Sequence, residues 1–536
     1  MTKNPTKQAA AAAPADRRRW LVLVICCVAS ALLGIDNSVL NYALPSLSRQ
    51  LDPSSTEMLW IVDVYGFVLG GLLIVAGNLG DRIGRKKLLL IGVAGFGATS
   101  ALCAYAPGPG TLIAARALLG LFGATIMPST LSLVRAAFDD PKERTTAVGL
   151  SGGIGAASFA LGPVVGGLLL DHFWWGSVFL INVPLMAVVL VAGFLVLPER
   201  RNPNPGRLDW VSVPLSAAGM FGVIYAIKTA ARDGLHDTTA WWPAAALGVV
   251  ALLAFWRRQT TVEQPLLDLR LFRNTAFSGA VGSNAVTMFT ATTLSLGCSL
   301  YFQVVRGWSP LTAGLALLPG PLSAAFAAPL CSVLIPKLGR ARTVALGLVL
   351  LSASTAAFAL VTADTAYWKL LPVLVVNGCG IIFIFSVTTD TILTSVPRGR
   401  TGTAAAVSET AMELGGALGI AVLGSVLNVV YRNNLALPTG LPAGSASAAK
   451  ESVTAGVETG GRLPGATGHT VVDAARSAYM TSMHSTMLVA AAIMLLGALA
   501  ALVTLRKVPA ELPQHQEDLD EAAQERAAGP LPSPSA

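Results

Sequence analysis

Long apolar runs separated by short polar segments recur along almost the whole chain. A bilayer core about 30 Å thick is crossed by about 20 apolar residues in a helix. The runs are continuous and lack the polar–apolar alternation of strands in a membrane barrel. We therefore predict an all-α membrane protein with 14 transmembrane helices, at about residues 20–44, 57–79, 87–106, 111–134, 145–170, 178–197, 209–230, 240–256, 276–304, 312–335, 343–362, 368–395, 402–430 and 484–505.

The composition also indicates that lipid surrounds much of the protein. Hydrophobic residues make up 53% of the 536 residues and charged residues 12%, whereas a soluble protein has about 25% charged residues. The polar ends, 1–19 and 508–536, are too poor in apolar groups to fold alone, and the longest stretch outside the apolar runs is 431–483. No segment is long enough for a soluble catalytic domain, so we expect no enzyme.

The basic residues predict the orientation of the chain. Lysine and arginine concentrate in the loops that follow even-numbered helices, as in Arg82–Lys87, Arg135–Arg144 and Lys337–Arg342. Because positive loops stay on the cytoplasmic side, both termini are expected inside, in a cytoplasmic (inner) membrane. The net charge of +8 is then a topology signal with some attraction to anionic lipid, and we expect no nucleic-acid partner.

An internal repeat divides the chain into two similar halves. The segment 78–92 is echoed by 333–347, with Gly84 matching Gly339 and Arg85 matching Arg340. Two copies in the same orientation indicate two bundles of six helices, related by an axis along the membrane normal, with a substrate site between them. We predict an N-terminal bundle at 20–200, two extra helices within 201–260 and a C-terminal bundle at 261–507, with an extracytoplasmic loop at 431–483.

Acidic residues within the apolar runs are candidate functional groups. An ionised side chain inside a membrane is costly unless it is paired, and usually marks a substrate or proton pathway. Asp36 lies in the middle of the first helix, next to Asn37, and Asp63 lies in the second. Arg116 in the fourth helix keeps its charge at any working pH and needs a carboxylate partner. Asp390, at a helix end, is assigned no role.

The thirteenth helix carries two further acids, Glu409 and Glu413. They are four residues apart, so they share a face and repel each other. Aromatic and sulfur-containing side chains are candidates for a broad cavity that binds cations, although such side chains are more often part of helix packing and aromatic ones also anchor membrane interfaces. The candidates for the cavity lining are Trp60, Tyr65, Phe289 and Met412, together with the polar Asn37.

Several motifs together carry a family resemblance. They are Gly77–Lys87 with Asp81, Arg82, Gly84 and Arg85, the Asp36 segment Gly34–Pro45, Arg116–Gly123, Gly162-Pro163-Val-Val-Gly166-Gly167, and Val178–Pro184. The chain resembles the major facilitator superfamily, and within it the fourteen-helix drug:proton antiporters of the EmrB/QacA subfamily. The stretch with Glu409 and Glu413 is similar to pumps for quaternary-ammonium cations. In this family the motif at Gly77–Lys87 stabilises the outward-facing state, and the motif at Gly162–Gly167, in the fifth predicted helix, is typical of exporters.

The resemblance implies a proton-driven multidrug exporter and a role in antibiotic resistance. A carboxyl held out of water takes up a proton more readily, so proton and cationic substrate compete for Asp36, Asp63, Glu409 or Glu413. No phosphate-binding loop is present, and we expect no cofactor or metal; the proton gradient supplies the energy. We expect a monomer acting on lipophilic or cationic small molecules. Export of an endogenous secondary metabolite is an alternative; uptake and a non-transporting membrane sensor are disfavoured.

Overall fold

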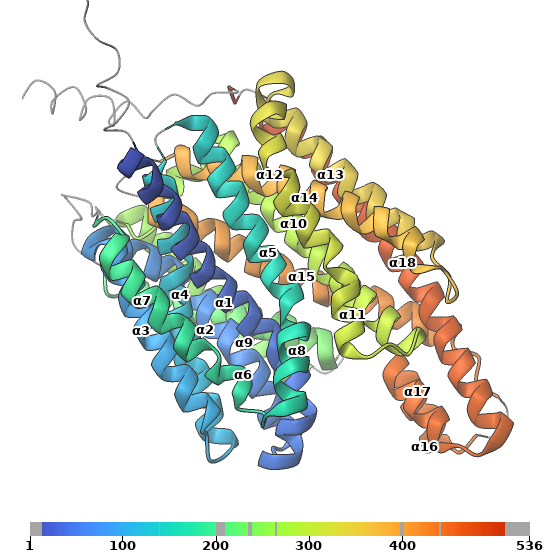
Figure 1. The fold of residues 1–536 in the computed structure, drawn as a ribbon. Coiled ribbons are helices and arrows are strands. Elements are labelled where there is room, and N and C mark those ends of the chain that lie inside the picture. The colour runs from blue at the N-terminus through green and yellow to red at the C-terminus, as the bar shows by residue number, and fades with distance from the viewer. Residues whose placement is uncertain are drawn as a thin grey trace, which may run out of the picture.

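The protein is helical throughout the part that the structure describes. A computed structural model describes residues 13–138, 140–199, 209–233, 238–262, 265–396, 401–438, 441–506 and 508–509, and every regular element in these ranges is a helix (Figure 1). The sequence-based expectation of an all-α protein is therefore confirmed for the described residues. Of the predicted tails 1–19 and 508–536, residues 1–12 and 510–536 lie outside the described ranges, whereas residues 13–19 are already helical, so the N-terminal tail is shorter than predicted.

The first half of the chain forms one bundle around its own apolar core. This core runs from Val22 to Leu197 and includes Phe96 and Phe179, both fully buried. Small residues allow close packing of α1 with α5, since a Cβ on Gly162 would lie 2.7 Å from that of Ser38. The elements of this half are α1 (Ala13–Leu51), α2 (Ser55–Ile83), α3 (Arg85–Ala104), α4 (Pro109–Ala137), α5 (Pro141–His172), α6 (Ser177–Leu180) and α7 (Asn182–Val196).

The second half forms another bundle with two core clusters. One lies near Phe277 and Leu348, and the other near Phe302 and Tyr479. The elements are η2 (Leu269–Arg273), α10 (Thr275–Leu300), η3 (Tyr301–Val305), α11 (Pro310–Leu317), α12 (Pro319–Leu338), α13 (Arg340–Ala357), η4 (Phe358–Leu360), α14 (Tyr367–Thr394), α15 (Thr401–Asn434), α16 (Ala443–Glu451), α17 (Val453–Arg462) and α18 (Gly465–Thr504).

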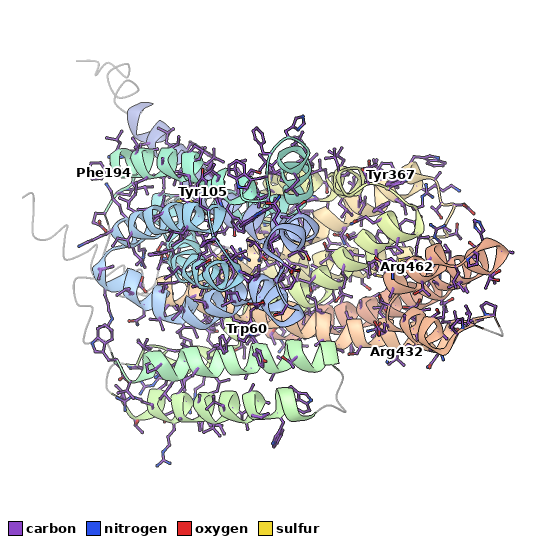
Figure 2. All side chains as sticks on the ribbon, turned by 90° about the horizontal axis from the view of Figure 1, so that it is seen from below. Trp60, Tyr105, Phe194, Tyr367, Arg432 and Arg462 are labelled. Carbon is purple, nitrogen blue, oxygen red and sulfur yellow. The ribbon has the colours of Figure 1, made fainter. Side chains whose placement is uncertain are left out.

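Two linker helices connect the halves and lie outside them. They are α8 (Ser212–Asp233) and α9 (Thr238–Thr261), the green pair along one edge of Figure 2. The inner helix, α8, packs against α2 of the first half and α15 of the second, and α9 packs on α8. The linker pair therefore covers a seam between the two bundles.

The surface of the bundle is apolar enough for lipid. Large apolar side chains such as Leu195, Phe326 and Val503 are mostly exposed. Within the described ranges, eleven helices are long and apolar enough to cross a membrane; α5, α8 and α9 are not among them, although Ser212–Ile227 is a shorter apolar helix. The protein is therefore a multi-pass membrane protein.

The repeat seen in the sequence is also a structural repeat. Gly84 joins α2 to α3 with a φ of 104°, and Gly339 joins α12 to α13 with a φ of 79°. Glycine adopts this left-handed conformation without the steric cost that a Cβ adds. Both turns lie at the end of the bundle where α1 begins and α18 ends, which we call the terminal side; the opposite end, with α16 and α17, is the hairpin side (Figure 1).

The structure corrects the expected boundaries of the last long loop. The sequence predicts an extracytoplasmic loop at 431–483, in which a short helical hairpin is plausible; in the structure α15 continues to Asn434 and α18 begins at Gly465. The polar residues of 465–483 lower the hydropathy, but Val471, Ala475 and Tyr479 are buried against the rest of the second half. Helix α18 therefore extends beyond its apolar part, and α16 and α17 form a short hairpin beside it.

Candidate functional site

A buried ion pair lies at the centre of the first half. Asp36 on α1 is fully buried, and its Oδ2 lies 3.0 Å from Nη1 of Arg116 on α4. The Nε of Arg116 also donates to the main-chain oxygen of Ile61 on α2, at 3.2 Å. A buried charge is tolerated when it is paired and its remaining hydrogen-bonding groups have partners. The sequence supplied both members of this pair, and the structure brings them together.

Two further side chains complete the surroundings of the pair. The amide of Asn182 at the start of α7 donates to Oδ1 of Asp36 at 2.8 Å and to Oγ of Ser100 on α3 at 3.2 Å. The guanidinium of Arg116 lies 4.7 Å from the ring centre of Tyr65 and 5.8 Å from that of Phe179. Sequence reasoning missed Asn182 as a site residue, although it lies within the motif Val178–Pro184, where an amide side chain inside an apolar run was the available signal.

The hairpin side contains a cavity between the halves. It has a volume of about 550 Å³ and is lined by residues of α2, α8, α10, α15, α17 and α18. Trp60 and Asp63 are among the lining residues, and Asp63 is half-buried there. The remaining lining residues are Phe67, Tyr225, Thr229, Thr293, Leu296, Leu300, Ala417, Ile420, Gly424, Leu427, Asn428, Tyr431, Ser452, Val453, Thr454 and Tyr479.

The other aromatic and polar candidates are not part of this lining. Tyr65 is fully buried over Arg116, whereas Asn37, Phe289 and Met412 are half-buried. The main-chain oxygen of Phe289 faces Gly419, where α10 and α15 pack closely. Tyr65 therefore belongs to the surroundings of the ion pair, and Phe289 to the contact between α10 and α15.

Glu409 and Glu413 lie on α15, the helix that packs against α2, α8 and α10. Both side chains are half-buried. Gly415 and Gly419 allow α15 to approach the backbone of α10 at Ala285 and Phe289. The two acids are thus on a helix that contacts both halves. They precede Ala417, the first residue of α15 that lines the cavity, and so lie closer to the terminal side.

On the terminal side, Asp81 links the two halves. Its carboxylate accepts hydrogen bonds from the backbone N–H groups of Gly402 at 3.0 Å and Thr403 at 3.1 Å, at the start of α15, and from Nη2 of Arg85 at 3.0 Å. An anion is favoured at a helix N-terminus by the unpaired N–H groups and the helix dipole. Arg82 donates to the side chain of Asn78 at 2.6 Å, within α2.

Close packing accompanies the Asp81 contact. A Cβ on Gly77 would lie 2.6 Å from the Cβ of Ala406, and one on Gly402 would lie 2.6 Å from the main-chain oxygen of Gly77. The backbones of α2 and α15 therefore touch, which only glycine permits at these positions. This region holds the two halves together on the terminal side.

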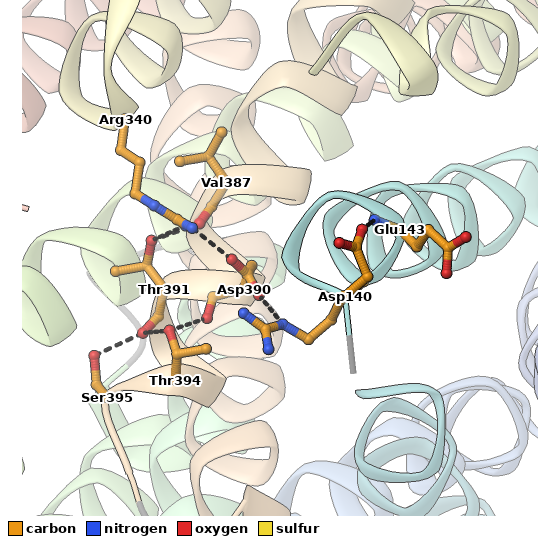
Figure 3. A network of polar contacts seen from close by, with 9 residues as sticks. Asp140, Glu143, Arg340, Val387, Asp390, Thr391, Thr394 and Ser395 are labelled. Carbon is orange, nitrogen blue, oxygen red and sulfur yellow. Dashed lines mark hydrogen bonds and ion pairs between the residues drawn. The ribbon is translucent and has the colours of Figure 1, made fainter. Parts of the chain in front are cut away.

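A second link between the halves involves Asp390, which sequence reasoning left unassigned. This fully buried residue on α14 accepts from Nε of Arg144 on α5 at 3.0 Å and from Nη2 of Arg340 on α13 at 2.7 Å (Figure 3). Arg340 also donates to Thr391 at 3.1 Å. The repeat contained a signal for this site, because Arg340 matches Arg85 and therefore calls for an acidic partner like Asp81.

The glycine motif at residues 162–167 is part of α5 and faces α1 and α11. Gly162 faces Ser38 and Val39, Gly166 is buried, and a Cβ on Gly167 would lie 3.6 Å from Leu311 of the second half. Pro163 lies within α5, but its side chain is outside the described part of the structure. Among the described residues, no group of three His, Cys, Asp or Glu side chains could hold a metal ion.

Comparison with known proteins places this geometry in a family. The model of the Major Facilitator Superfamily matches residues 26–420. The chain is 40% identical to the multidrug efflux pump LfrA of Mycolicibacterium smegmatis, over 91% of this chain and 97% of the relative. It is 34% identical to the methyl viologen resistance protein SmvA of Salmonella typhimurium, over 89% and 96% of the two chains.

Two further comparisons extend this result. The chain is 32% identical to the tetracenomycin C resistance and export protein of Streptomyces glaucescens, over 92% of this chain and 93% of the relative. Its structure is similar to the human organic anion transporter MFSD10, with a TM-score of 0.59 over 91% of this chain and 99% of that one. The sequence identity of 13% in that comparison supports the shared fold alone.

Proposed function

The chain belongs to the major facilitator superfamily and is a drug efflux transporter, and from this premise we propose that it is a proton-coupled exporter of lipophilic cations. The observation that carries the proposal is the buried Asp36–Arg116 pair. Relatives of the chain are named as a multidrug efflux pump and a methyl viologen resistance protein. A carboxylate that is kept from water can alternate between a proton and a positive partner.

Proton coupling is assigned to the acids of the membrane region. Asp36 exchanges its ion pair with Arg116 for a proton, and Glu409, Glu413 and Asp63 bind either a proton or the cationic substrate. Because proton and cation exclude each other at a carboxylate, inward proton movement drives the substrate outward. The membrane potential contributes about 2.3 kcal/mol per charge per 100 mV. This scheme needs no cofactor.

The direction of transport sets the orientation that we propose. The terminal side carries the basic residues Arg82, Arg85 and Lys86, so it is assigned to the cytoplasm, with both termini inside an inner membrane. Helices α5, α8 and α9 are proposed as spans in addition to the eleven apolar helices of the described ranges, which gives 14. Contacts of Asp81 and Asp390 close the cytoplasmic side, and the cavity lies on the outer side. The transporter is proposed to act as a monomer.

The experiment uses purified full-length protein in proteoliposomes with ethidium at equal concentration on both sides of the membrane. We expect ethidium to move across the membrane against its gradient when a proton gradient is imposed, with a matching flux of protons reported by a pH-sensitive dye. Collapse of the proton gradient should abolish the accumulation. Movement of ethidium that is unaffected by the collapse would rule out proton coupling.

Export of a secondary metabolite is the second candidate. It is favoured by the 32% identity with a protein named for both resistance and export of tetracenomycin C. Both candidates use the same fold and ion pairs, so they differ only in substrate. Competition of ethidium export by neutral polyketides would favour the metabolite, whereas competition by quaternary-ammonium compounds alone would favour cations.

A further inference from the structure

The linker helix α8 forms part of the cavity on the hairpin side. Tyr225 and Thr229 of α8 line it, next to Trp60 and Asp63 of α2. The opposite wall comes from α10, α15, α17 and α18. A helix that lies outside both bundles therefore supplies a wall of the cavity between them. Figure 2 shows Trp60 beside the green linker pair.

The wall formed by α2 and α8 is built from stacked aromatic rings. The rings of Phe221 and Tyr225, one helical turn apart on α8, are 6.3 Å apart and nearly parallel at 4°. Trp60 lies 5.7 Å from Tyr225 at an interplanar angle of 22°. Phe67 contacts both α8 rings edge-on, at 5.2 and 5.8 Å. Phe221 and Phe67 thereby hold the plane of the Tyr225 ring that borders the cavity.

The cavity favours positive charge. Asp63 lies three residues after Trp60 on α2, so the carboxylate and the indole share a face. Among the lining residues of the described chain, none is Lys or Arg. On the opposite wall, the hydroxyl of Tyr431 donates to Ala449 at 2.9 Å and that of Tyr479 donates to Gly297 at 2.7 Å. These hydroxyls are engaged with the backbone, while ring faces attract cations.

We propose that α2 and the linker helix α8 form a binding site for planar aromatic cations. In this site Tyr225 and Trp60 stack on the ligand, and Asp63 balances its charge. The volume of about 550 Å³ lies in the usual range for small-molecule sites, about 300–1,000 Å³. The proposal rests on the proposed function and adds a role for α8 in substrate selection, apart from the Asp36–Arg116 pair.

The test measures ethidium binding to the purified full-length protein in detergent, by fluorescence. Tyr225→Leu removes the ring and is expected to weaken binding about tenfold. Tyr225→Phe keeps the ring and is expected to cost less than about threefold. The matched control is Trp242→Leu on α9, an aromatic side chain that is 60% exposed and outside the cavity lining. Equal affinities for Tyr225→Leu and Trp242→Leu would overturn the proposal.

A second variant covers the case in which Tyr225→Leu does not fold, as judged by size-exclusion chromatography. Thr229→Leu places a larger side chain in the cavity and is expected to weaken ethidium binding about tenfold; unchanged binding would overturn the site. Tetraphenylphosphonium, whose rings are not coplanar, should lose less affinity than ethidium in Tyr225→Leu, and an equal loss would contradict stacking.

The two proposals fail in different ways. If the wild-type protein exports ethidium but neither α8 variant changes binding, the α8 site is wrong and the exporter stands. If the wild-type protein neither binds nor exports ethidium or tetraphenylphosphonium, the proposed export of cations is wrong.

Discussion

Arg144 on α5 and Asp390 on α14 form an ion pair between the two halves, with 3.0 Å between Nε and Oδ1. The same carboxylate binds Arg340 at 2.7 Å, and Asp81 makes the corresponding contact from the first half to the start of α15. Each half thus contributes one buried aspartate to the terminal side. Both aspartates hold the halves together there, while the cavity lies on the hairpin side.

Asp390→Asn is expected to weaken the closed terminal side. The amide would remove the negative charge that Arg144 and Arg340 share, and loss of one member of a buried pair costs about 3–5 kcal/mol. We expect a melting temperature in detergent lower by about 5 °C or more. A cysteine introduced by Ala406→Cys, at the contact with Gly77, should react faster with a thiol reagent in this variant.

The control for Asp390→Asn is Glu458→Gln on α17. Glu458 and Arg462 form a solvent-exposed pair at 4.0 Å, and exposed pairs contribute about 0–1 kcal/mol. Its melting temperature and labelling rate should equal those of the parent protein. The native cysteines are buried except for half-buried Cys379, so their reaction is slow. Equal behaviour of Asp390→Asn and Glu458→Gln would show that the ion pair is unimportant.

Gly77→Ala is expected to slow export by about tenfold, because the new methyl group would force α2 and α15 apart. The Cβ would come within 2.6 Å of Ala406, whereas a Cβ on Gly66 of the same helix has no heavy atom within 4 Å. Gly66→Ala is therefore the matched control and should export within about twofold of wild type. The measurement is the initial rate of ethidium export in proteoliposomes. Similar rates for both variants would contradict the role of close packing.

Much of the fold follows from the sequence because apolar runs of membrane length have few alternatives in lipid. The ionic members of the central site were also predictable, since Asp36 and Arg116 each need a partner within the membrane. Their pairing was less predictable, because 80 residues separate them and only the packing of α1 against α4 brings them together.

Other features depend on contacts that periodicity does not encode. Tyr225 and Phe221 read as ordinary apolar-run residues, and their position beside Trp60 depends on where α8 packs. The start of α18 at Gly465 depends on burial of Val471 and Tyr479 in the second half, which hydropathy does not detect. Asp390 lies near a helix end in the sequence, and only the packing of α5 and α13 against α14 brings Arg144 and Arg340 to it.

Single and double variants of Asp36 and Arg116 can separate the role of this pair in stability from its role in transport. Asp36→Asn and Arg116→Gln should each lower the melting temperature, because each leaves one buried charge unpaired. The double variant removes both charges and should recover much of that loss. None of the three should accumulate ethidium in response to a proton gradient. Gradient-driven export by the double variant would show that this pair only stabilises the fold.

An ion pair between Asp209 and Arg258 joins the segment before α8 to the end of α9. Asp209 accepts hydrogen bonds from Nε of Arg258 at 2.7 Å and Nη2 at 2.8 Å, and from Ser212 at 2.6 Å. The hydrogen bonds from Arg258 are the main cause of a pKa of Asp209 well below its usual value. The pair fixes the start of α8 against the end of α9. Asp209→Asn should lower the melting temperature only slightly, because Arg258 is partly exposed and water screens such a pair.

The sign of the pH dependence follows from the lowered pKa of Asp209. A carboxylate whose pKa is lower in the folded than in the unfolded state, where it is about 3.9, stabilises the fold above that value and loses this effect as pH falls through the folded pKa. The difference in melting temperature between wild type and Asp209→Asn should therefore be constant from about pH 5 to 8 and shrink below about pH 4. Asp473→Asn, at an exposed residue of α18, is the control and should show no difference at neutral pH. A difference for Asp209→Asn that grows on acidification would mean that the protonated form of Asp209 makes the stabilising contact.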